Sequence, residues 1–498
     1  MCRELSIVTL AGLTNSVPDR AKISLMSTNL RCGIAISLLF SAASLNAQSG
    51  GTTRFTPLAE GQPVIDAYRG KLPKSLPEQA IRDPAAWQQY VRQRDREVRA
   101  RLLQGDLDTL ANLLLFGTSY TRQRVITPAL LNEISSRAPH ERSLAWNTYR
   151  QRLHDLTAGL ASPGTNQRLI YMRSLVEKQG LHFQTAAQLD EVQKFLAANL
   201  VRMLRDDQSF AAALATARKA DAEGEFRARS QVFEQRGISL DTTLFPNFAI
   251  EEALKQLKDR GLLRPGSVGR VAVVGPGLDV INKDAGFDFY SEQTIQPFAL
   301  IDSLFRLGLA NSKQLTVTTL DISSNVNSHL TSVRQKASRG KGYTLQLPLR
   351  GDIHWTPEAV SYWQKFGLAI GKSIPPLTPV QEVGEVKLRA VGIPASQTLR
   401  VRPADLNVVL EHLVLPADRR FDLIVGTNVF VYYGEFEQAL AEINIAQMLK
   451  PNGILLTNDA LPTGRGATLE EIASSTTIYS DRRADGDRIV WMRAKKLH

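Results

Sequence analysis

Small and acidic residues follow directly on short runs of β-strand character in the second half of the chain. Gly275-Pro276-Gly277 follows the run Val271–Val274, and Asp321 ends the run Leu315–Leu320. Because glycine has no side chain, a backbone turn at such a corner can approach a bound ligand closely. An acidic residue at a strand tip is the usual partner of ribose hydroxyls in dinucleotide-binding folds. The pattern therefore predicts a ligand site at the ends of strands.

The elements that would position these residues alternate between helix and strand. The remaining expected elements are, in chain order, a helix at Ala249–Gly261, a helix from Pro297 to Gly308, the strand Leu399–Arg402 ending near Asp405, the strand Phe421–Val425 leading into Thr427 and Asn428, a helix at Glu435–Leu449 and the strand Ile454–Thr457. This alternation predicts an α/β fold with a doubly wound parallel sheet, whose ligands bind at the carboxyl ends of the strands.

The last segment departs from a plain dinucleotide-binding domain. Thr476–Ser480 and Arg488–Ala494 have strand character, and Ala484–Asp487 supplies a glycine-containing turn between them. A terminal hairpin adds one antiparallel strand to the sheet. We therefore expect a mostly parallel seven-stranded sheet that ends in an antiparallel hairpin.

Several segments together resemble the class I S-adenosylmethionine-dependent methyltransferases over roughly Gly261 to the C-terminus. The block from Phe421 to Leu456 is similar to the chemotaxis-receptor methyltransferase branch of that family. The resemblance rests on VAVVGPGLD at 271–279, LTVTTLD at 315–321, LRVRPADL at 399–406, FDLIVGTNVFVYY at 421–433, LKPNGILLTND at 449–459 and the closing hairpin.

The resemblance implies that S-adenosylmethionine is the cofactor, and it assigns roles to individual residues. Asp321 would accept hydrogen bonds from the ribose hydroxyls, Asp405 would face the adenine amino group, and Leu406 would lie beside the ring. The full cofactor-binding set that it implies is Gly275, Pro276, Gly277, Asp279, Asp321, Asp405, Leu406 and Thr427.

The methyl donor and the acceptor would meet beyond the fourth strand. Thr427 and Asn428 leave this strand, and Tyr432 and Tyr433 could wall the pocket with aromatic faces that suit a sulfonium cation. Methyl transfer displaces a group at an already activated carbon, so alignment and desolvation can supply much of the acceleration. No catalytic residue is assigned, and Asn428 and Tyr432 are the candidates.

The glycine motif departs from the family pattern at two positions. Val273 stands where an acidic residue is usual, and Asp279 replaces the third glycine. Asp279 either binds the methionine amino group of the cofactor or caps the loop that follows. That loop, residues 279–296, stands where the family turns straight into a helix, and it could also be a lid that contacts substrate.

A second insertion, at about 340–397, separates the second and third strands of the sheet. It contains possible strands at Tyr343–Leu349 and Val386–Val391. Such an insertion either contributes to substrate choice or is a packed surface subdomain. His354 and His412 are single histidines without metal-ligand spacing, and we interpret both as structural.

The first part of the chain divides into an export signal and a helical domain. Arg31, an uncharged run from Cys32 to Leu45 and a small residue, Ala47, predict a secretory signal at residues 1–47, with Met26 as an alternative start. If this signal is cleaved, the protein is periplasmic or secreted. The alternative to a cleaved signal is a buried first helix or an uncleaved anchor. Without a working signal, the protein is cytoplasmic. Residues 48–240 are expected to form a helical domain of unknown purpose, and residues 241–498 the methyltransferase-like domain.

Composition and charge set limits on the class of protein. The 498 residues are 43% hydrophobic and 22% charged, which is ordinary for a globular protein. The formal charge of +11 is spread thinly, so we expect no nucleic-acid partner. The two cysteines, Cys2 and Cys32, have no metal-ligand spacing, and we expect neither a metal site nor a transmembrane span.

Three functions remain open from the sequence. The first is a methyltransferase that uses S-adenosylmethionine and an unidentified small-molecule or protein acceptor. The second is a non-catalytic envelope binding protein built on a degenerate methyltransferase fold, favoured by the export signal and the altered glycine motif. The third is a nicotinamide-dependent oxidoreductase, which is the weakest because Val280 stands where G-x-G-x-x-G needs its last glycine.

Overall fold

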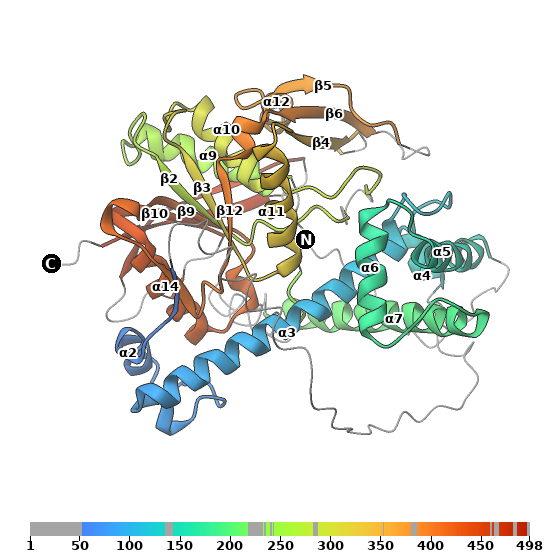
Figure 1. Ribbon diagram of the computed structural model, residues 1–498, viewed down its shortest axis with the longest axis horizontal. Coiled ribbons are helices and arrows are strands. Elements are labelled where there is room, and N and C mark those ends of the chain that lie inside the picture. Colours follow the sequence, from blue (N-terminus) through green and yellow to red (C-terminus); the bar gives the residue numbers. More distant parts are fainter. Residues whose placement is uncertain are drawn as a thin grey trace.

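The computed structural model describes residues 52–134, 143–217, 233, 236–239, 242, 244–281, 287–351, 353–379, 386–458, 461–462, 468–481 and 486–495. Its central feature is a seven-stranded sheet with the strand order β11-β12-β10-β9-β2-β3-β7 (Figure 1). The bounds of these strands are β2 Arg270–Val274, β3 Thr316–Asp321, β7 Val401–Asp405, β9 Phe421–Gly426, β10 Leu449–Thr457, β11 Leu469–Ile478 and β12 Gly486–Ala494.

The sheet confirms the expected fold class. Strands β7, β3, β2, β9 and β10 pair in parallel, and β12 pairs antiparallel with both β10 and β11. Numbered along the chain within this sheet, the strands therefore lie in the order 3-2-1-4-5-7-6. The order reverses direction at β2 and β9, and this is the place where ligands bind in open α/β sheets.

Two strands of the sheet begin earlier than expected: β11 begins at Leu469 instead of Thr476, and β10 begins at Leu449 instead of Ile454. Pro451–Gly453, whose residue types are typical of a turn, lie inside β10, where the pairing with β9 shifts between Leu449 and Ile454. Asn452 takes a positive φ of 64° there, a conformation that asparagine tolerates better than most residues. The turn residues thus form an irregularity within the strand.

The helices have the following bounds: α2 Leu58–Ala67, α3 Pro84–Phe116, α4 Pro128–Ile134, α5 Leu144–Ala161, α6 Gln167–Lys178, α7 Ala186–Ala217, α9 Pro246–Asp259, α10 Gln296–Arg306, α11 Ser324–Ser338, α12 Pro357–Lys365, α13 Ala395–Thr398 and α14 Glu435–Met448, with 3₁₀ turns at Glu78–Ile81, Ala417–Arg419 and Phe430–Tyr432. Side chains cap several helix starts. Asp83 caps α3, which begins with Pro84, by accepting a hydrogen bond from the Ala85 N–H. Ser323 caps α11 by accepting one from the Val326 N–H.

Alternate residues of the central strand face two different hydrophobic cores. Val271 and Val273 pack into the core that contains α9 and α10, whereas Ala272 and Val274 pack into the core that contains α14. This period of two is the pattern of a strand that is buried on both faces. The sheet is therefore covered on both sides, as a doubly wound fold requires.

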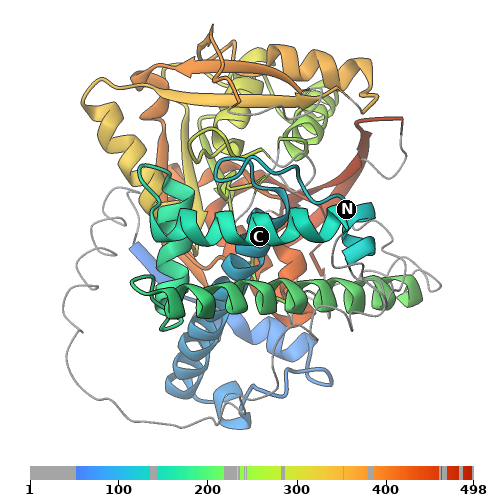
Figure 2. The same cartoon turned by 90° about the vertical axis from the view of Figure 1, so that its right-hand side faces the viewer.

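Helix α3 passes from one core to the other. Trp87 and Val98 in its first half are buried in the core with α14, and Leu110 and Leu113 in its second half are buried with α5, α6 and α7. Figure 1 shows α3 running obliquely below the sheet from α2 towards α7. In the view of Figure 2, α5 and α7 extend across the front of the molecule. The helical region and the sheet therefore share cores; the boundary expected at 240 stays a prediction.

The start of the described chain pairs with a strand that the sequence did not reveal. Strand β1, Thr52–Phe55, pairs antiparallel with β8, Glu411–Val414. His412 on β8 is buried, and its Nδ1 lies 3.1 Å from the Asn444 Oδ1 of α14. Burial lowers the pKa of this histidine. The contact fits the structural interpretation of His412.

The insertion forms a small antiparallel sheet with the order β4-β6-β5 at the top of Figure 1. Its strands are β4 Tyr343–Arg350, β5 Lys372–Ile374 and β6 Val386–Ile393, so the two strands expected there are confirmed. The ring of Trp355 stacks on Phe245 with a centroid distance of 4.2 Å. This stack joins the insertion to the start of α9.

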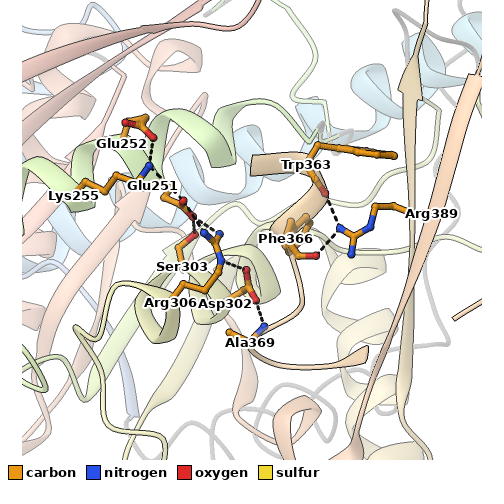
Figure 3. A network of polar contacts seen from close by, with 10 residues as sticks. All are labelled: Glu251, Glu252, Lys255, Asp302, Ser303, Arg306, Trp363, Phe366, Ala369 and Arg389. Atoms are coloured by element: carbon orange, nitrogen blue, oxygen red, sulfur yellow. Dashed lines mark hydrogen bonds and ion pairs between the residues drawn. The ribbon is translucent and has the colours of Figure 1, made fainter. Parts of the chain in front are cut away.

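A buried polar network fixes the insertion to α9 and α10 (Figure 3). The Arg306 guanidinium donates to both carboxylate oxygens of Glu251 and, at 2.7 Å, to Asp302 Oδ2. Asp302 Oδ1 accepts from the Ala369 N–H at 2.9 Å. Arg389 on β6 donates to two carbonyls at the end of α12. Both carboxylates are buried, so their charges need nearby cations: Arg306 pairs with both, and Lys255 lies 3.8 Å from Glu251 Oε1.

Two further expectations concern membranes and export. Among the described residues, no helix combines the length and apolar character that crossing a bilayer requires. The expected signal at residues 1–47 lies outside the described residues.

Candidate functional site

A cavity lies at the carboxyl ends of β2, β3, β7 and β9, where the strand order reverses. This is the position at which the sequence predicted a ligand site. The predicted site residues that line it are Gly275, Gly277, Asp321, Leu406, Thr427, Asn428 and Tyr432. Residues from the ends of four separate strands therefore meet around one space.

The glycine corner forms one wall of the cavity. Gly275 and Gly277 have φ values of 60° and 64°, which side-chain-bearing residues rarely adopt. A Cβ atom on Gly275 would lie 2.8 Å from Val429 Cγ2, another lining residue. Pro276 is buried between the glycines and is not among the lining residues. Both the backbone conformation and the close approach require glycine at position 275.

Asp321 presents a buried carboxyl group to the cavity. Its residue is 7% exposed, its Oδ1 accepts from the Ser323 N–H at 2.7 Å, and the Gly277 N–H also donates to it. Burial raises the pKa of Asp321 to about 7 in spite of these backbone donors. A carboxyl that titrates near neutrality and borders a cavity is a strong hydrogen-bond acceptor once ionised.

Asp405 is the neighbour of Asp321 in the β3–β7 pairing but has a different environment. Its Oδ1 forms an ion pair of 2.8 Å with Arg99 Nη2 of α3. Asp405 is not among the lining residues, whereas Leu406, buried beside it, is. The adenine-facing role of Asp405 therefore stays a prediction.

Asp279 is engaged within its own loop. Its Oδ2 accepts from the Tyr290 hydroxyl at 2.7 Å and from Gln293 Nε2 at 2.9 Å, and its N–H donates to the Gln293 carbonyl. Asp279 does not line the cavity. These contacts fit the alternative in which Asp279 caps the loop that follows it. Binding of the methionine amino group by Asp279 stays a prediction.

The loop after Asp279 is tied to the helical region. The buried Arg168 of α6 donates to the carbonyls of Asp279, Val280 and Tyr290. Asp288 accepts from the backbone and hydroxyl groups of Thr118 and Ser119 beyond α3. The described part of this loop is thus packed between the two halves of the chain.

The end of β9 brings polar groups to the cavity. Thr427 Oγ1 accepts from Gln296 Nε2 at 2.8 Å, and Gln296 also lines the space. Asn428 has a φ of 59°, and its N–H donates to Asn458 Oδ1 at 2.7 Å. This left-handed conformation turns the chain sharply away from the strand. Asn428 is exposed, so it can meet a molecule that enters from solvent.

The two tyrosines that follow have distinct surroundings. Tyr432 is half-buried at the cavity, and Phe233 meets its ring edge to face at 5.4 Å. Tyr433 is buried, and the Arg101 guanidinium lies over its ring at 6.0 Å. Burial raises the pKa of Tyr433 well above its usual value. Both tyrosines line the cavity, as the sequence suggested.

Sequence reasoning missed the wall that the N-terminal half supplies. Leu102 of α3 and the segment Ile238-Ser239 line the cavity. A Cβ on Gly105 would lie 2.0 Å from the Ile238 carbonyl oxygen, so α3 and this segment touch through their backbones. An isolated glycine inside a helical pattern often marks such a close contact, and Gly105 was the available signal.

No cluster of metal ligands is found within the part of the chain that the structure describes.

The lining of the cavity suits a nucleoside. The Asp321 carboxyl can accept hydrogen bonds from ribose hydroxyls, and Leu406 beside the glycine backbone offers an apolar surface to a flat ring.

Comparison with protein-family models gives no match, and comparison with curated proteins gives none either. The chain is similar to solved methyltransferase structures. They include the citrinin polyketide synthase CMeT domain (13% identity, 86% of this chain and 100% of that chain, TM-score 0.26), the N-methyltransferase NodS from Bradyrhizobium japonicum WM9 (12%, 49% and 97%, 0.24) and an O-methyltransferase family protein from Burkholderia thailandensis (14%, 79% and 95%, 0.24). These likenesses are too distant to bear on function, and the fold class rests on the strand order itself.

Proposed function

We propose that the chain binds S-adenosylmethionine in this cavity and transfers its methyl group to an acceptor. The observation that supports the proposal is the buried Asp321 carboxyl facing the same space as the Gly275–Gly277 corner, at the switch point of the sheet.

The lining residues fit the parts of the cofactor that need recognition. Asp321 would accept hydrogen bonds from the ribose hydroxyls, and the glycine backbone leaves room for the chain that carries the sulfonium. Leu406 and Leu102 offer apolar surface for a base. S-adenosylmethionine supplies, when bound, a methyl group that is already activated. The protein's own task is then to align the acceptor and exclude water.

Residues beyond β9 would receive the acceptor. Thr427, Asn428 and Tyr432 border the cavity beyond the carboxyl end of β9, where Asn428 is exposed. The sequence similarity to the chemotaxis-receptor branch rests on the block from Phe421 to Leu456 and does not identify an acceptor. If residues 1–47 are cleaved as an export signal, the protein is periplasmic or secreted, and otherwise it is cytoplasmic; mass determination of the native N-terminus would decide between these two locations.

Isothermal titration calorimetry with S-adenosylmethionine and S-adenosylhomocysteine tests the proposal. We expect binding that is lost in Asp321→Ala and weakened at least tenfold in Asp405→Ala. Asp418→Ala, at an exposed aspartate in the 3₁₀ turn before β9, is the matched control and should bind as the wild type does. An absence of heat with both ligands at millimolar concentration would contradict the proposal.

The second candidate is a non-catalytic binding protein on the same fold. It is favoured by Asp279, whose Oδ2 accepts from Tyr290 and Gln293 of its own loop. Tight binding of S-adenosylhomocysteine together with methyl transfer to any acceptor in a tritium-release screen would exclude this candidate.

A further inference from the structure

The two aspartates at the tips of β3 and β7 are direct neighbours. Asp321 and Asp405 are paired residues in the parallel register, so their backbones lie about 5 Å apart. Two carboxylates that are this close resist being ionised together, and burial of Asp321 increases the cost. A nucleoside that is held by both side chains is bound most strongly when both carboxyl groups are ionised acceptors.

Helix α3 places a guanidinium group between these two strand tips. Arg99 Nη2 lies 2.8 Å from Asp405 Oδ1, and Arg99 Nη1 donates at 3.0 Å to the carbonyl of Ile322, the residue after Asp321. Arg99 Nε donates to both Asp95 carboxylate oxygens at 3.0–3.1 Å. Its three fixed partners hold the charge in one position.

Several other charged or titratable groups face this position. Asp95 comes from α3, Asp405 from β7, Glu411 from β8, and Tyr433 from the turn after β9. Burial raises the pKa of Asp321 and of Glu411 to about 7 each, and the Arg99 charge opposes both increases. Arg99 therefore faces a predominantly acidic surrounding.

We propose that Arg99, supplied by the N-terminal helical region, is a positioning residue for nucleoside binding: it orients Asp405 and allows Asp321 and Asp405 to be ionised together. This inference rests on the proposed function. It also gives the helical region a purpose, because α3 then completes the binding site that the sheet begins.

The inference predicts a particular pH dependence. If the ionised form of Asp321 binds the ligand, affinity falls as the pH drops below about 7 in the wild type. Loss of the nearby positive charge should move that midpoint up by about one pH unit. At pH 7 the dissociation constant of the variant without this charge should then be about fivefold higher than that of the wild type. At pH 9 the two dissociation constants should lie closer together.

The test is calorimetry with S-adenosylhomocysteine from pH 5.5 to 9 on the full chain. Arg99→Met should show the shifted midpoint, and Arg99→Lys should restore it because the charge is retained. Arg96→Met, at an exposed position three residues earlier on α3, is the matched control and should follow the wild type. A merely structural role for Arg99 would weaken binding equally at every pH; this result, or an unchanged profile, would overturn the inference.

A second measurement needs no ligand and separates this inference from the proposed function. The free energy of unfolding is measured against pH for four proteins: the wild type, Asp321→Asn, Arg99→Met and the double variant. In each background, the effect of Asp321→Asn on this free energy should change at the pH where Asp321 titrates. We expect this pH to be higher in the Arg99→Met background. Coincident transitions would overturn the inference even if S-adenosylhomocysteine binds, and a wild type that binds no ligand would overturn the proposed function and the nucleoside role together.

Discussion

Replacing Gly275 by alanine separates the two reasons for a glycine at the cavity. An L-residue at a φ of 60° costs about 1–2 kcal/mol of stability. The new Cβ would also lie 2.8 Å from Val429 Cγ2, well inside the 3.5–4.0 Å of a normal carbon–carbon contact. Val429 would have to move, and it lines the cavity.

Gly261→Ala is the matched control for this substitution. Gly261 has a φ of 70°, and a Cβ there would meet no heavy atom within 4 Å. It therefore carries the same backbone cost without the contact. We expect a loss of about 1 kcal/mol in Gly261→Ala and about 2–3 kcal/mol in Gly275→Ala.

Urea unfolding and calorimetry with S-adenosylhomocysteine measure the two effects. Gly275→Ala should weaken binding at least tenfold, and Gly261→Ala should leave it unchanged. Wild-type affinity in Gly275→Ala would refute the claim that this corner lies against the ligand.

Three further predictions concern stability. Because the folded-state pKa of Asp321 is raised from 3.8 to about 7, its stabilising contribution is present below about pH 4 and is lost as the pH rises through 7. Urea unfolding of Asp321→Asn should therefore show an advantage over the wild type that grows by about 2–3 kcal/mol from pH 5 to pH 8; a constant difference would contradict this. Arg168→Met removes the guanidinium that donates to three carbonyls of the loop after β2, and it should lose at least about 3 kcal/mol of stability. Lys178→Met, exposed on the same helix, should change the stability by less than about 0.5 kcal/mol; equal shifts of the melting temperature in the two variants would show that Arg168 does not hold this loop to the helical region. Arg306→Met leaves the buried Asp302 without its ion pair and Glu251 with only its 3.8 Å ion pair to Lys255, and it should cost about 3–5 kcal/mol, as measured by denaturant midpoints. Lys255→Met, which removes a partly exposed cation, should cost less than about 1 kcal/mol; a small effect of Arg306→Met would show that the network is dispensable.

Most of the sheet could be predicted because strands and turns leave local signals. The strand-like runs before Gly275 and Asp321 became β2 and β3, and the expected hairpin became β11 and β12. The alternation with helices predicted parallel strands, and the closing hairpin predicted an antiparallel strand; the order of the strands in the sheet came from the structure. Such signals depend on neighbouring residues, which a sequence displays directly.

The elements that were missed depend on distant parts of the chain. Strand β8 is four residues long and exists through pairing with β1, from the far end of the described chain. The Pro451–Gly453 segment keeps a turn-like irregularity, but Leu449 on its far side also pairs with β9, so β10 begins earlier than the local signal indicates. Pairing with distant residues thus sets the existence of β8 and the start of β10.

The candidate site was predicted in part for the same reason. Residues at strand tips, such as Asp321 and Thr427, could be placed because parallel strands end at one edge of the sheet. The ion pair between Arg99 and Asp405 could not, since no local pattern links α3 to β7. Asp279 left two alternatives open, because only the fold brings Tyr290 and Gln293 to its carboxyl group.

The most direct test of the central claim is a crystal structure of the full chain grown with saturating S-adenosylhomocysteine. We expect ligand density at the carboxyl ends of β2 and β3, with both ribose hydroxyls within hydrogen-bond distance of the Asp321 carboxylate. Density elsewhere on the protein, or an Asp321 side chain that turns away from the bound ribose, would contradict it.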